Sequence, residues 1–266
     1  MGVRILTDSA AGLPASLAAD LGIRVLELHV MDNEGERSTS GLSALELAAE
    51  FGREMERSGD DGVLAIHLSK ELSSTWSAAV TASGVFPGTV RVIDSGSAGM
   101  VQGAAAMAAA ALARQGASVD ECYEAAMDTL RRGATWIYLT STEDLRRSGR
   151  LSTATAVLST ALLATKPIMS LNEGKIELVG KTRTQTKAFT KVVDLVASRA
   201  EGQPAFVAIQ YSGVDGAEET AERLADLLEQ ALPVGSSFLR VPLNDLLSVH
   251  LGAGAIGVSV VFSQEC

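Results

Sequence analysis

Apolar segments of strand length alternate with helical segments through the first half of this chain, and this alternation restricts the fold more than any other feature. The predicted strands are Val3–Leu6, Ile23–Val30, Gly62–Leu68, Val90–Ile93 and Trp136–Leu139. The predicted helices are Pro14–Leu21, a segment capped by Ser43 that carries Leu45, Leu47, Phe51 and Met55, a segment from Thr75, Ala98–Arg114 and Val119–Arg132. Such alternation predicts an α/β fold with a parallel sheet, helices on both of its faces, and ligands at the carboxyl ends of its strands.

Hydroxyl-rich turns come after these predicted strands. Thr7-Asp8-Ser9, Ser73-Ser74-Thr75 and Asp94-Ser95 each follow an apolar run, and Ser38-Thr39-Ser40 ends a predicted polar loop, Met31–Ser40. The carboxyl ends of parallel strands lie at one edge of a sheet, so four such turns favour a binding site there. The alternative is that Ser, Thr and Asp are ordinary turn residues.

The stretch Ile66–Trp76 is the strongest candidate for this site. An apolar strand breaks into a turn at Ser69, and helical spacing returns at Thr75, which puts Ser73 or Ser74 near the N-cap. Free N–H groups, the helix dipole and several hydroxyls can hold a carboxylate or phosphate oxygen without a formal positive charge. The alternative is that Ser73 only caps the helix.

The pattern changes near Lys166. Lys166–Leu171 and Lys175–Val179 are joined by Asn172-Glu173-Gly174, which predicts a hairpin that strand–helix alternation does not require. We therefore expect an N-terminal α/β/α domain over residues 1–163 and a C-terminal α/β domain with a mixed sheet over residues 164–266. The predicted later elements are a helix at Thr184–Ala200, a strand at Ala205–Ile209, a helix at Gly216–Ala231, and strands at Ser237–Val241 and Ala255–Phe262.

Charge and cysteine content exclude several classes of protein. The formal charge of −10 argues against nucleic-acid binding and favours small molecules or proteins as partners. Cys122 and Cys266 are the only cysteines and imply neither a disulfide framework nor a metal site. The first residues lack the features of a signal peptide, and the alanine-rich run Ala104–Ala113 is too short to span a bilayer. We expect a cytoplasmic protein without a membrane span, which leaves open a transient contact with a membrane surface.

Enzyme motifs are mostly absent. The segment Gly174–Thr182 resembles a phosphate-binding loop, but five residues instead of four separate its glycines. With only three histidines, a histidine-rich metal site is not expected. His29 and His67 lie in predicted strands and are interpreted as structural, whereas His250 lies in a glycine-rich loop and is a functional candidate. A serine hydrolase acting on acyl esters, with His250 as the base for Ser73, is one open alternative.

Taken together, the motifs resemble those of the DegV family from one end of the chain to the other. They are Thr7-Asp8-Ser9-Ala10-Ala11-Gly12-Leu13-Pro14, Ser38-Thr39-Ser40, Leu72-Ser73-Ser74-Thr75-Trp76-Ser77-Ala78, Val92-Ile93-Asp94-Ser95, Arg147-Ser148-Gly149-Arg150-Leu151-Ser152, Lys166-Pro167-Ile168 and His250-Leu251-Gly252-Ala253-Gly254. The resemblance implies a bacterial two-domain protein that binds a long-chain fatty acid in an apolar tunnel between its domains. Some members are the carrier subunit of a fatty acid kinase, whose other subunit transfers phosphate from ATP to the bound carboxylate.

The resemblance also implies roles for individual residues. It places Ser73, the backbone of Ser74, Thr39 and His250 on the carboxylate, and Arg150 and Arg183 near the mouth of the site. It implies no catalytic residue, metal or cofactor, and no activity without the kinase partner. This chain departs from the family pattern in three places: Ser74 replaces a glycine, Gly41-Leu42 replaces Gln-Pro, and Leu251-Gly252-Ala253-Gly254 replaces Thr-Gly-Pro-Gly. The segments Ala98–Ala113 and Ala154–Thr165 have the small apolar residues of a tunnel wall, although a close-packed helical core has the same composition.

Overall fold

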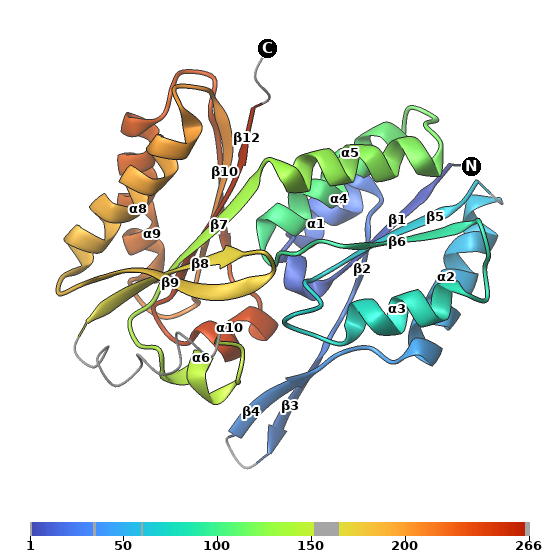
Figure 1. The fold of residues 1–266 in the computed structure, drawn as a ribbon, viewed down its shortest axis with the longest axis horizontal. Coiled ribbons are helices and arrows are strands. Elements are labelled where there is room, and N and C mark those ends of the chain that lie inside the picture. Colours follow the sequence, from blue (N-terminus) through green and yellow to red (C-terminus); the bar gives the residue numbers. More distant parts are fainter. Residues whose placement is uncertain (1, 34–35, 60, 152–164, 264–266) are drawn as a thin grey trace. The chain divides into compact units, whose positions relative to one another are not determined.

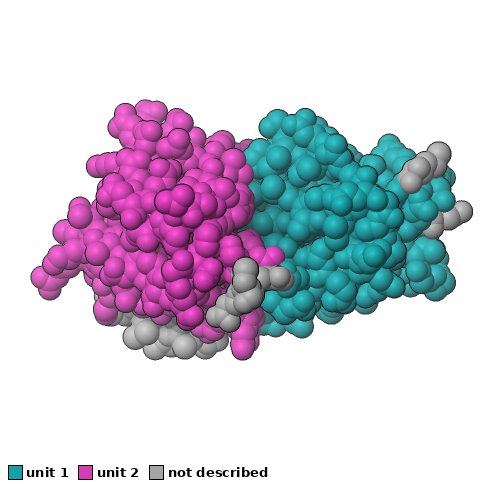
Figure 2. Space-filling view, turned by 90° about the horizontal axis from the view of Figure 1, so that it is seen from above, with its two compact units in different colours: residues 1–131 teal, residues 132–266 magenta. Residues whose placement is uncertain are grey.

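A computed structural model describes residues 2–33, 36–59, 61–151 and 165–263. The chain forms two compact units, unit 1 at Met1–Arg131 and unit 2 at Arg132–Cys266 (Figure 2). Each unit contains a sheet of its own and is described by itself. The predicted segment Ala154–Thr165 lies, except for Thr165, outside the described residues.

Unit 1 is built on a four-stranded parallel sheet (Figure 1). Its strands are β1 (Arg4–Asp8), β2 (Arg24–Leu26), β5 (Val63–His67) and β6 (Val90–Asp94), in the order β2-β1-β5-β6. The register places Thr7 beside Ile66, and Ile66 beside Ile93. This arrangement confirms the parallel sheet that the alternation predicted.

Helices cover both faces of this sheet (Figure 1). They are η1 (Ser9–Ala11), α1 (Ala15–Leu21), α2 (Ala44–Ser58), α3 (Thr75–Ser83), α4 (Met100–Ala113) and α5 (Val119–Arg131). On one face, Leu64, Ile66 and Ile93 pack in a core cluster with alanines of α4 and with Cys122 and Ala126 of α5. Small side chains let helix and sheet approach closely, so α4 fits the close-packed core alternative for Ala98–Ala113. On the other side, Ser43 starts α2 with a capping box to Glu46, as predicted.

The segment predicted as a polar loop, Met31–Ser40, is part of a hairpin. Strands β3 (His29–Asn33) and β4 (Glu36–Ser40) pair antiparallel, with Val30 opposite Thr39, and form a separate two-stranded sheet. The loop prediction was wrong because every residue of β3 is exposed. The sequence therefore lacks the alternation of apolar and polar residues from which a strand can be predicted. Main-chain pairing defines this element, and it carries the candidate residue Thr39.

Unit 2 is built on a six-stranded mixed sheet. Its strands are β7 (Gly133–Tyr138), β8 (Lys166–Asn172), β9 (Lys175–Thr182), β10 (Ala205–Tyr211), β11 (Ser237–Pro242) and β12 (Ile256–Phe262), in the order β11-β10-β12-β7-β8-β9. Strands β10 and β11 are parallel, and the other neighbours are antiparallel. The helices are α6 (Glu143–Arg147), α8 (Gln185–Ala200), α9 (Ala217–Ala231) and α10 (Asp245–Leu251). Residues of α8 and α9 bury one face of the sheet, where Phe189 contacts Tyr138 edge to face at 5.3 Å.

The β8–β9 hairpin confirms the prediction made from its turn. Glu173 and Gly174 both have positive φ, at 47° and 78°, which suits a two-residue hairpin turn. The predicted domain boundary after residue 163 differs from the division at residue 131. The physical reason is strand β7, which was expected in the N-terminal sheet but pairs with β8 and β12.

Candidate functional site

The turn between β5 and α3 holds a cluster of hydroxyls. Ser74 occupies the N-cap position of α3, but its side chain makes no capping hydrogen bond. The capping oxygen comes from Ser73, whose Oγ accepts the Thr75 N–H at 3.2 Å and lies 2.9 Å from Thr75 Oγ1. Ser74 is exposed, Ser73 is half-buried and Thr75 is fully buried. The sequence correctly predicted a serine at this helix start: Ser74 occupies the N-cap position, and Ser73 supplies the side-chain oxygen.

The β3–β4 hairpin brings a second segment to this cluster. Strand β4 carries Thr39 and leads into Gly41, whose backbone lies against the hydroxyls of Ser73, Ser74 and Thr75. The hairpin therefore brings Gly41 to the turn that carries Ser73 and Ser74, and Thr39 lies two residues before Gly41 on β4.

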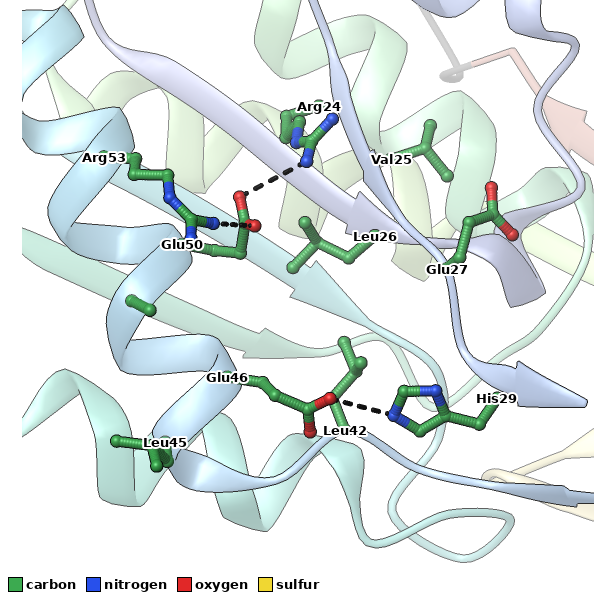
Figure 3. Close-up of a pocket in the computed structure, with 11 residues that line it drawn as sticks. Arg24, Val25, Leu26, Glu27, His29, Leu42, Leu45, Glu46, Glu50 and Arg53 are labelled. Atoms are coloured by element: carbon green, nitrogen blue, oxygen red, sulfur yellow. Dashed lines mark hydrogen bonds and ion pairs between the residues drawn. The ribbon is translucent and has the colours of Figure 1, made fainter.

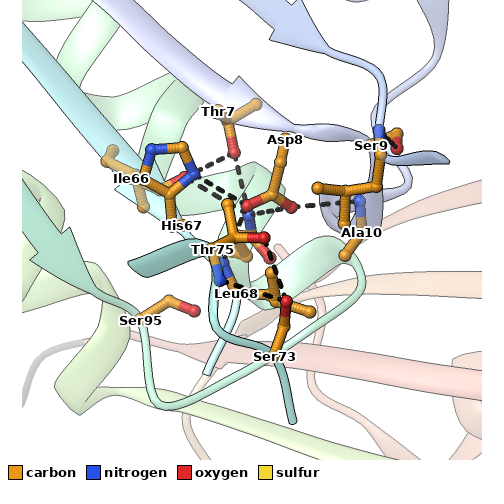
Figure 4. Close-up of polar contacts among 12 residues, drawn as sticks. Thr7, Asp8, Ser9, Ala10, Ile66, His67, Leu68, Ser73, Thr75 and Ser95 are labelled. Atoms are coloured by element: carbon orange, nitrogen blue, oxygen red, sulfur yellow. Dashed lines mark hydrogen bonds and ion pairs between the residues drawn. The ribbon is translucent and has the colours of Figure 1, made fainter. Parts of the chain in front are cut away.

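A buried polar network lies at the ends of β1 and β5 (Figure 4). The Asp8 carboxylate accepts hydrogen bonds from the N–H of Ala10 at 3.1 Å and of Leu68 at 3.0 Å, and from Gln102 Nε2 at 3.0 Å. Its Oδ2 also lies 2.9 Å from His67 Nδ1, and both side chains are completely buried. These contacts occupy both carboxylate oxygens, so Asp8 supports the turn, and His67 contributes its Nδ1 to the same network. This agrees with the structural interpretation of His67.

Three of the four hydroxyl turns lie where the sequence predicted. The turns after β1, β5 and β6 are at the carboxyl edge of one parallel sheet, and Asp94 accepts the N–H of Lys70 at 3.2 Å and of Gly96 at 2.9 Å. The fourth, Ser38-Thr39-Ser40, is on the hairpin. Sequence reasoning missed the Asp8–His67 contact, because the two residues are 59 positions apart.

In unit 2, His250 lies in the last turn of helix α10 and not, as predicted, in the glycine loop that follows it. Burial, and to a lesser extent the nearby Arg150 guanidinium, lowers the pKa of His250 to about 4. The imidazole is therefore neutral at pH 7 and can donate one hydrogen bond and accept another. Of the two predicted arginines, Arg150 is close enough for its charge to act on His250, whereas Arg183 is exposed between β9 and α8.

The loop after His250 is held by contacts from neighbouring segments. Thr140 Oγ1 donates to the Ala253 carbonyl at 2.7 Å, and the Gly254 N–H donates to Ser212 Oγ at 2.7 Å. Gly252 has a φ of 76°, and a Cβ there would lie 2.3 Å from Asp144 Oδ2, so only glycine fits. The sequence did not predict which residues hold this loop.

The lowered pKa of His250 predicts a pH dependence of stability. Between about pH 6.5 and 4 the unfolded chain binds a proton at this residue and the folded chain does not, so the free energy of unfolding should fall as the pH falls through this window. We expect His250→Gln to show a smaller loss of stability than the wild type between pH 7 and pH 4.5, measured by urea unfolding. Equal losses of stability in the two proteins would contradict a lowered pKa of His250 in the folded chain.

A separate groove of about 520 Å³ lies on unit 1 between β2, β3 and α2 (Figure 3). Five of its ionisable side chains pair with each other: Glu50 with Arg24 at 3.4 Å and with Arg53, and His29 with Glu46 at 3.0 Å. None of the predicted head-group residues lines it. We therefore do not assign the carboxylate site to this groove.

The residues that the structure describes contain neither a metal-ion cluster nor a membrane-spanning helix. No three His, Cys, Asp or Glu side chains gather there in a way that would hold a metal ion. None of the helices within these ranges combines the length and the apolar character that crossing a bilayer requires.

Comparison with known proteins places the chain in a family. The family model described as "Uncharacterised protein, DegV family" matches residues 31–263. A DegV domain-containing protein of Corynebacterium glutamicum is 58% identical over 266 residues, which are 100% of this chain and 96% of the relative. The chain belongs to the DegV family. The family resemblance seen in the sequence is thereby confirmed.

Solved structures of DegV proteins share the fold over the whole length. A crystal structure of a DegV family protein from Corynebacterium glutamicum has a TM-score of 0.95 and 56% identity, with 100% of each chain covered. A DegV family protein from Thermus thermophilus, described for its fatty acid binding, has a TM-score of 0.89 and 27% identity, covering 99% of this chain and 100% of that one. The fold class predicted from the sequence, with a parallel-sheet and a mixed-sheet unit, is confirmed.

Proposed function

We propose that this DegV protein binds a long-chain fatty acid, whose carboxylate is received by Ser73, the backbone of Ser74, Thr39 and His250. The hydroxyl cluster at the start of α3 is the observation that carries the proposal. The fatty acid binding described for the Thermus thermophilus relative supports it, because the likeness extends over 99% of this chain.

The start of α3 has the chemistry that a carboxylate needs. The first N–H groups of a helix lack partners within the helix, and the dipole is positive there. Ser74 is exposed and its hydroxyl does not cap the helix, so it can turn toward a ligand. A carboxylate removed from water must keep hydrogen bonds or lose its charge, and hydroxyls with a neutral imidazole supply such bonds.

The acyl chain and the head group have different tasks in this proposal. Burial of about fourteen methylenes, at about 0.8 kcal/mol each, contributes roughly 11 kcal/mol of gross transfer free energy. The tail therefore dominates the affinity, and the hydroxyls fix where the carboxylate lies.

We further propose that the bound acid is presented to an ATP-dependent kinase subunit in the cytoplasm and that the chain has no activity alone. Arg150, beside His250, and the exposed Arg183 are the cations suited to an acyl phosphate or to the partner, because a guanidinium binds phosphate oxygens through two parallel hydrogen bonds.

Extraction tests the proposal. We expect organic extraction of the purified protein, followed by mass spectrometry, to release free fatty acid in about stoichiometric amount. A chromogenic acyl ester incubated with the same preparation should remain intact. Turnover of the ester, abolished by Ser73→Ala and accompanied by no retained fatty acid, would instead establish the serine hydrolase alternative.

A further inference from the structure

Thr140 fastens the loop that follows the His250 helix. It lies just after strand β7, and its Oγ1 donates a hydrogen bond to the Ala253 carbonyl at 2.7 Å. Its methyl group lies against Gly254, where a Cβ would come within 2.8 Å of Thr140 Cγ2. Both branches of this side chain therefore contact the loop, and a β-branched side chain has few other χ1 rotamers to adopt.

The segment that begins at Thr140 meets the end of the helix at two further points. A Cβ at Gly252 would lie 2.3 Å from Asp144 Oδ2, which places the first turn of α6 against the residue that follows α10. Farther along the same segment, the charge of Arg150 acts on His250. One continuous segment of the chain therefore borders the end of α10 from the loop back to His250.

Helix α10 has few means of its own to hold His250 in place. It has seven residues, and so short a helix is not stable by itself in water. Asn244 caps its first turn, and Leu246 and Leu251 are its buried residues. Because His250 lies in the last turn, the position of its ring depends on how the chain is held immediately after the helix.

We propose that Thr140 is a positioning residue for the head-group site, which fixes the end of α10 to the segment that carries Arg150 and so keeps His250 in one orientation. The inference rests on the proposed fatty acid binding and deepens it. Ser212 holds the next peptide group, at the Gly254 N–H, but it follows β10 and is not part of the segment that carries Arg150.

Titration with oleate tests this role. Thr140→Val keeps the shape of threonine but lacks the hydroxyl, and we expect it to raise the Kd for oleate about three- to tenfold, the range for one lost hydrogen bond. Thr140→Ser keeps the hydroxyl and should bind like the wild type. Thr190→Val is the matched control in the same unit, because Thr190 Oγ1 donates to the Thr186 carbonyl within α8, and it should leave the Kd unchanged.

A His250→Ala background shows whether Thr140 acts through His250. In that background, adding Thr140→Val should change the Kd by less than about twofold, because the side chain that Thr140 positions is absent. A loss of affinity as large as in the wild-type background would overturn the proposal, as would wild-type affinity in Thr140→Val. Thr140→Ala provides the same comparison if Thr140→Val does not fold.

The titration of His250 gives a second readout, which needs no ligand. The chain has three histidines, so NMR can follow each ring, and the spectrum of His250→Gln identifies the His250 signal. Since burial lowers the pKa of His250 to about 4, a loosened helix end in Thr140→Val should raise this pKa by at least about 0.5, and Thr140→Ser should not. An unchanged pKa in Thr140→Val would overturn the proposal. If the wild type binds no oleate, the proposed function itself fails, and this pKa still decides whether Thr140 positions His250.

Discussion

Replacement of Asp8 by alanine is expected to lower the free energy of unfolding of unit 1 by about 3–5 kcal/mol, because it removes the acceptor of several buried hydrogen bonds at once. The Asp8 side chain is completely buried and accepts hydrogen bonds from Ala10, Leu68 and Gln102 besides its contact with His67. Alanine would leave the N–H groups of Ala10 and Leu68 buried without this acceptor, and each unsatisfied group costs about 1–3 kcal/mol. Gln102 Nε2 would keep its contacts with Thr7 Oγ1 at 2.9 Å and the Ile66 carbonyl at 3.3 Å.

Urea unfolding followed by tryptophan fluorescence measures this effect. The chain has two tryptophans, Trp76 in unit 1 and Trp136 in unit 2, so a Trp136→Phe background leaves a reporter in unit 1 alone. Asp20→Ala, at an exposed position of the same unit, is the matched control and should change the free energy by less than about 0.5 kcal/mol. A loss below about 1 kcal/mol for Asp8→Ala would show that the network does not stabilise unit 1 as its burial implies.

Ser73→Ala is expected to weaken fatty acid binding by about 10- to 150-fold, which corresponds to one hydrogen bond to a charged group at about 1.5–3 kcal/mol. Binding should persist because the buried acyl chain supplies most of the affinity. The yield of acyl phosphate in the presence of a kinase subunit should fall further, since in-line attack by the carboxylate oxygen depends on its position to a fraction of an ångström.

The same assays on His250→Ala and on the double variant test whether the two residues address one carboxylate. They lie in different compact units, so their joint action is a proposal that measurement must decide. We expect the double variant to lose less affinity than the sum of the two single losses, because each group contributes only when the carboxylate is held in place. If the two single losses of affinity add up to the loss of the double variant, the two residues do not bind the same carboxylate. Wild-type affinity in both single variants would exclude both residues from the carboxylate site.

Charge reversal at Arg150 and Arg183 extends this measurement. If these cations serve the acyl phosphate or the partner, Arg150→Glu with Arg183→Glu should reduce the acyl phosphate yield more than the fatty acid affinity. An unchanged yield would remove both arginines from the proposal. Lys175→Glu, an exposed substitution on β9 of the same unit, is the control for a general change of surface charge.

Local patterns in the sequence were enough to predict most elements and part of the site. The Ser43 capping box, the turn at Glu173 and Gly174, and the start of α3 beside Ser73 are each specified within a few residues. A helix or strand that buries one face has apolar residues at the spacing of its own period. A helix start or a tight turn restricts the residue types that fit. For this reason Ser73 and Ser74 could be placed at a helix N-terminus from the sequence.

Only the tertiary structure decided which distant segments meet. The exposed strand β3 carries no apolar period, so its pairing with β4, which places Thr39, could not be predicted. Strand β7 has the same local sequence pattern whichever sheet it joins. Because it pairs with β8 and β12, it belongs to unit 2, and the division between the units lies at residue 131 instead of residue 163. The state of His250 likewise depends on the burial of its ring and on Arg150, 100 residues earlier in the chain by their numbers. Sequence periodicity reports which face of an element is buried, whereas pairing and burial depend on groups that only the folded chain brings within contact.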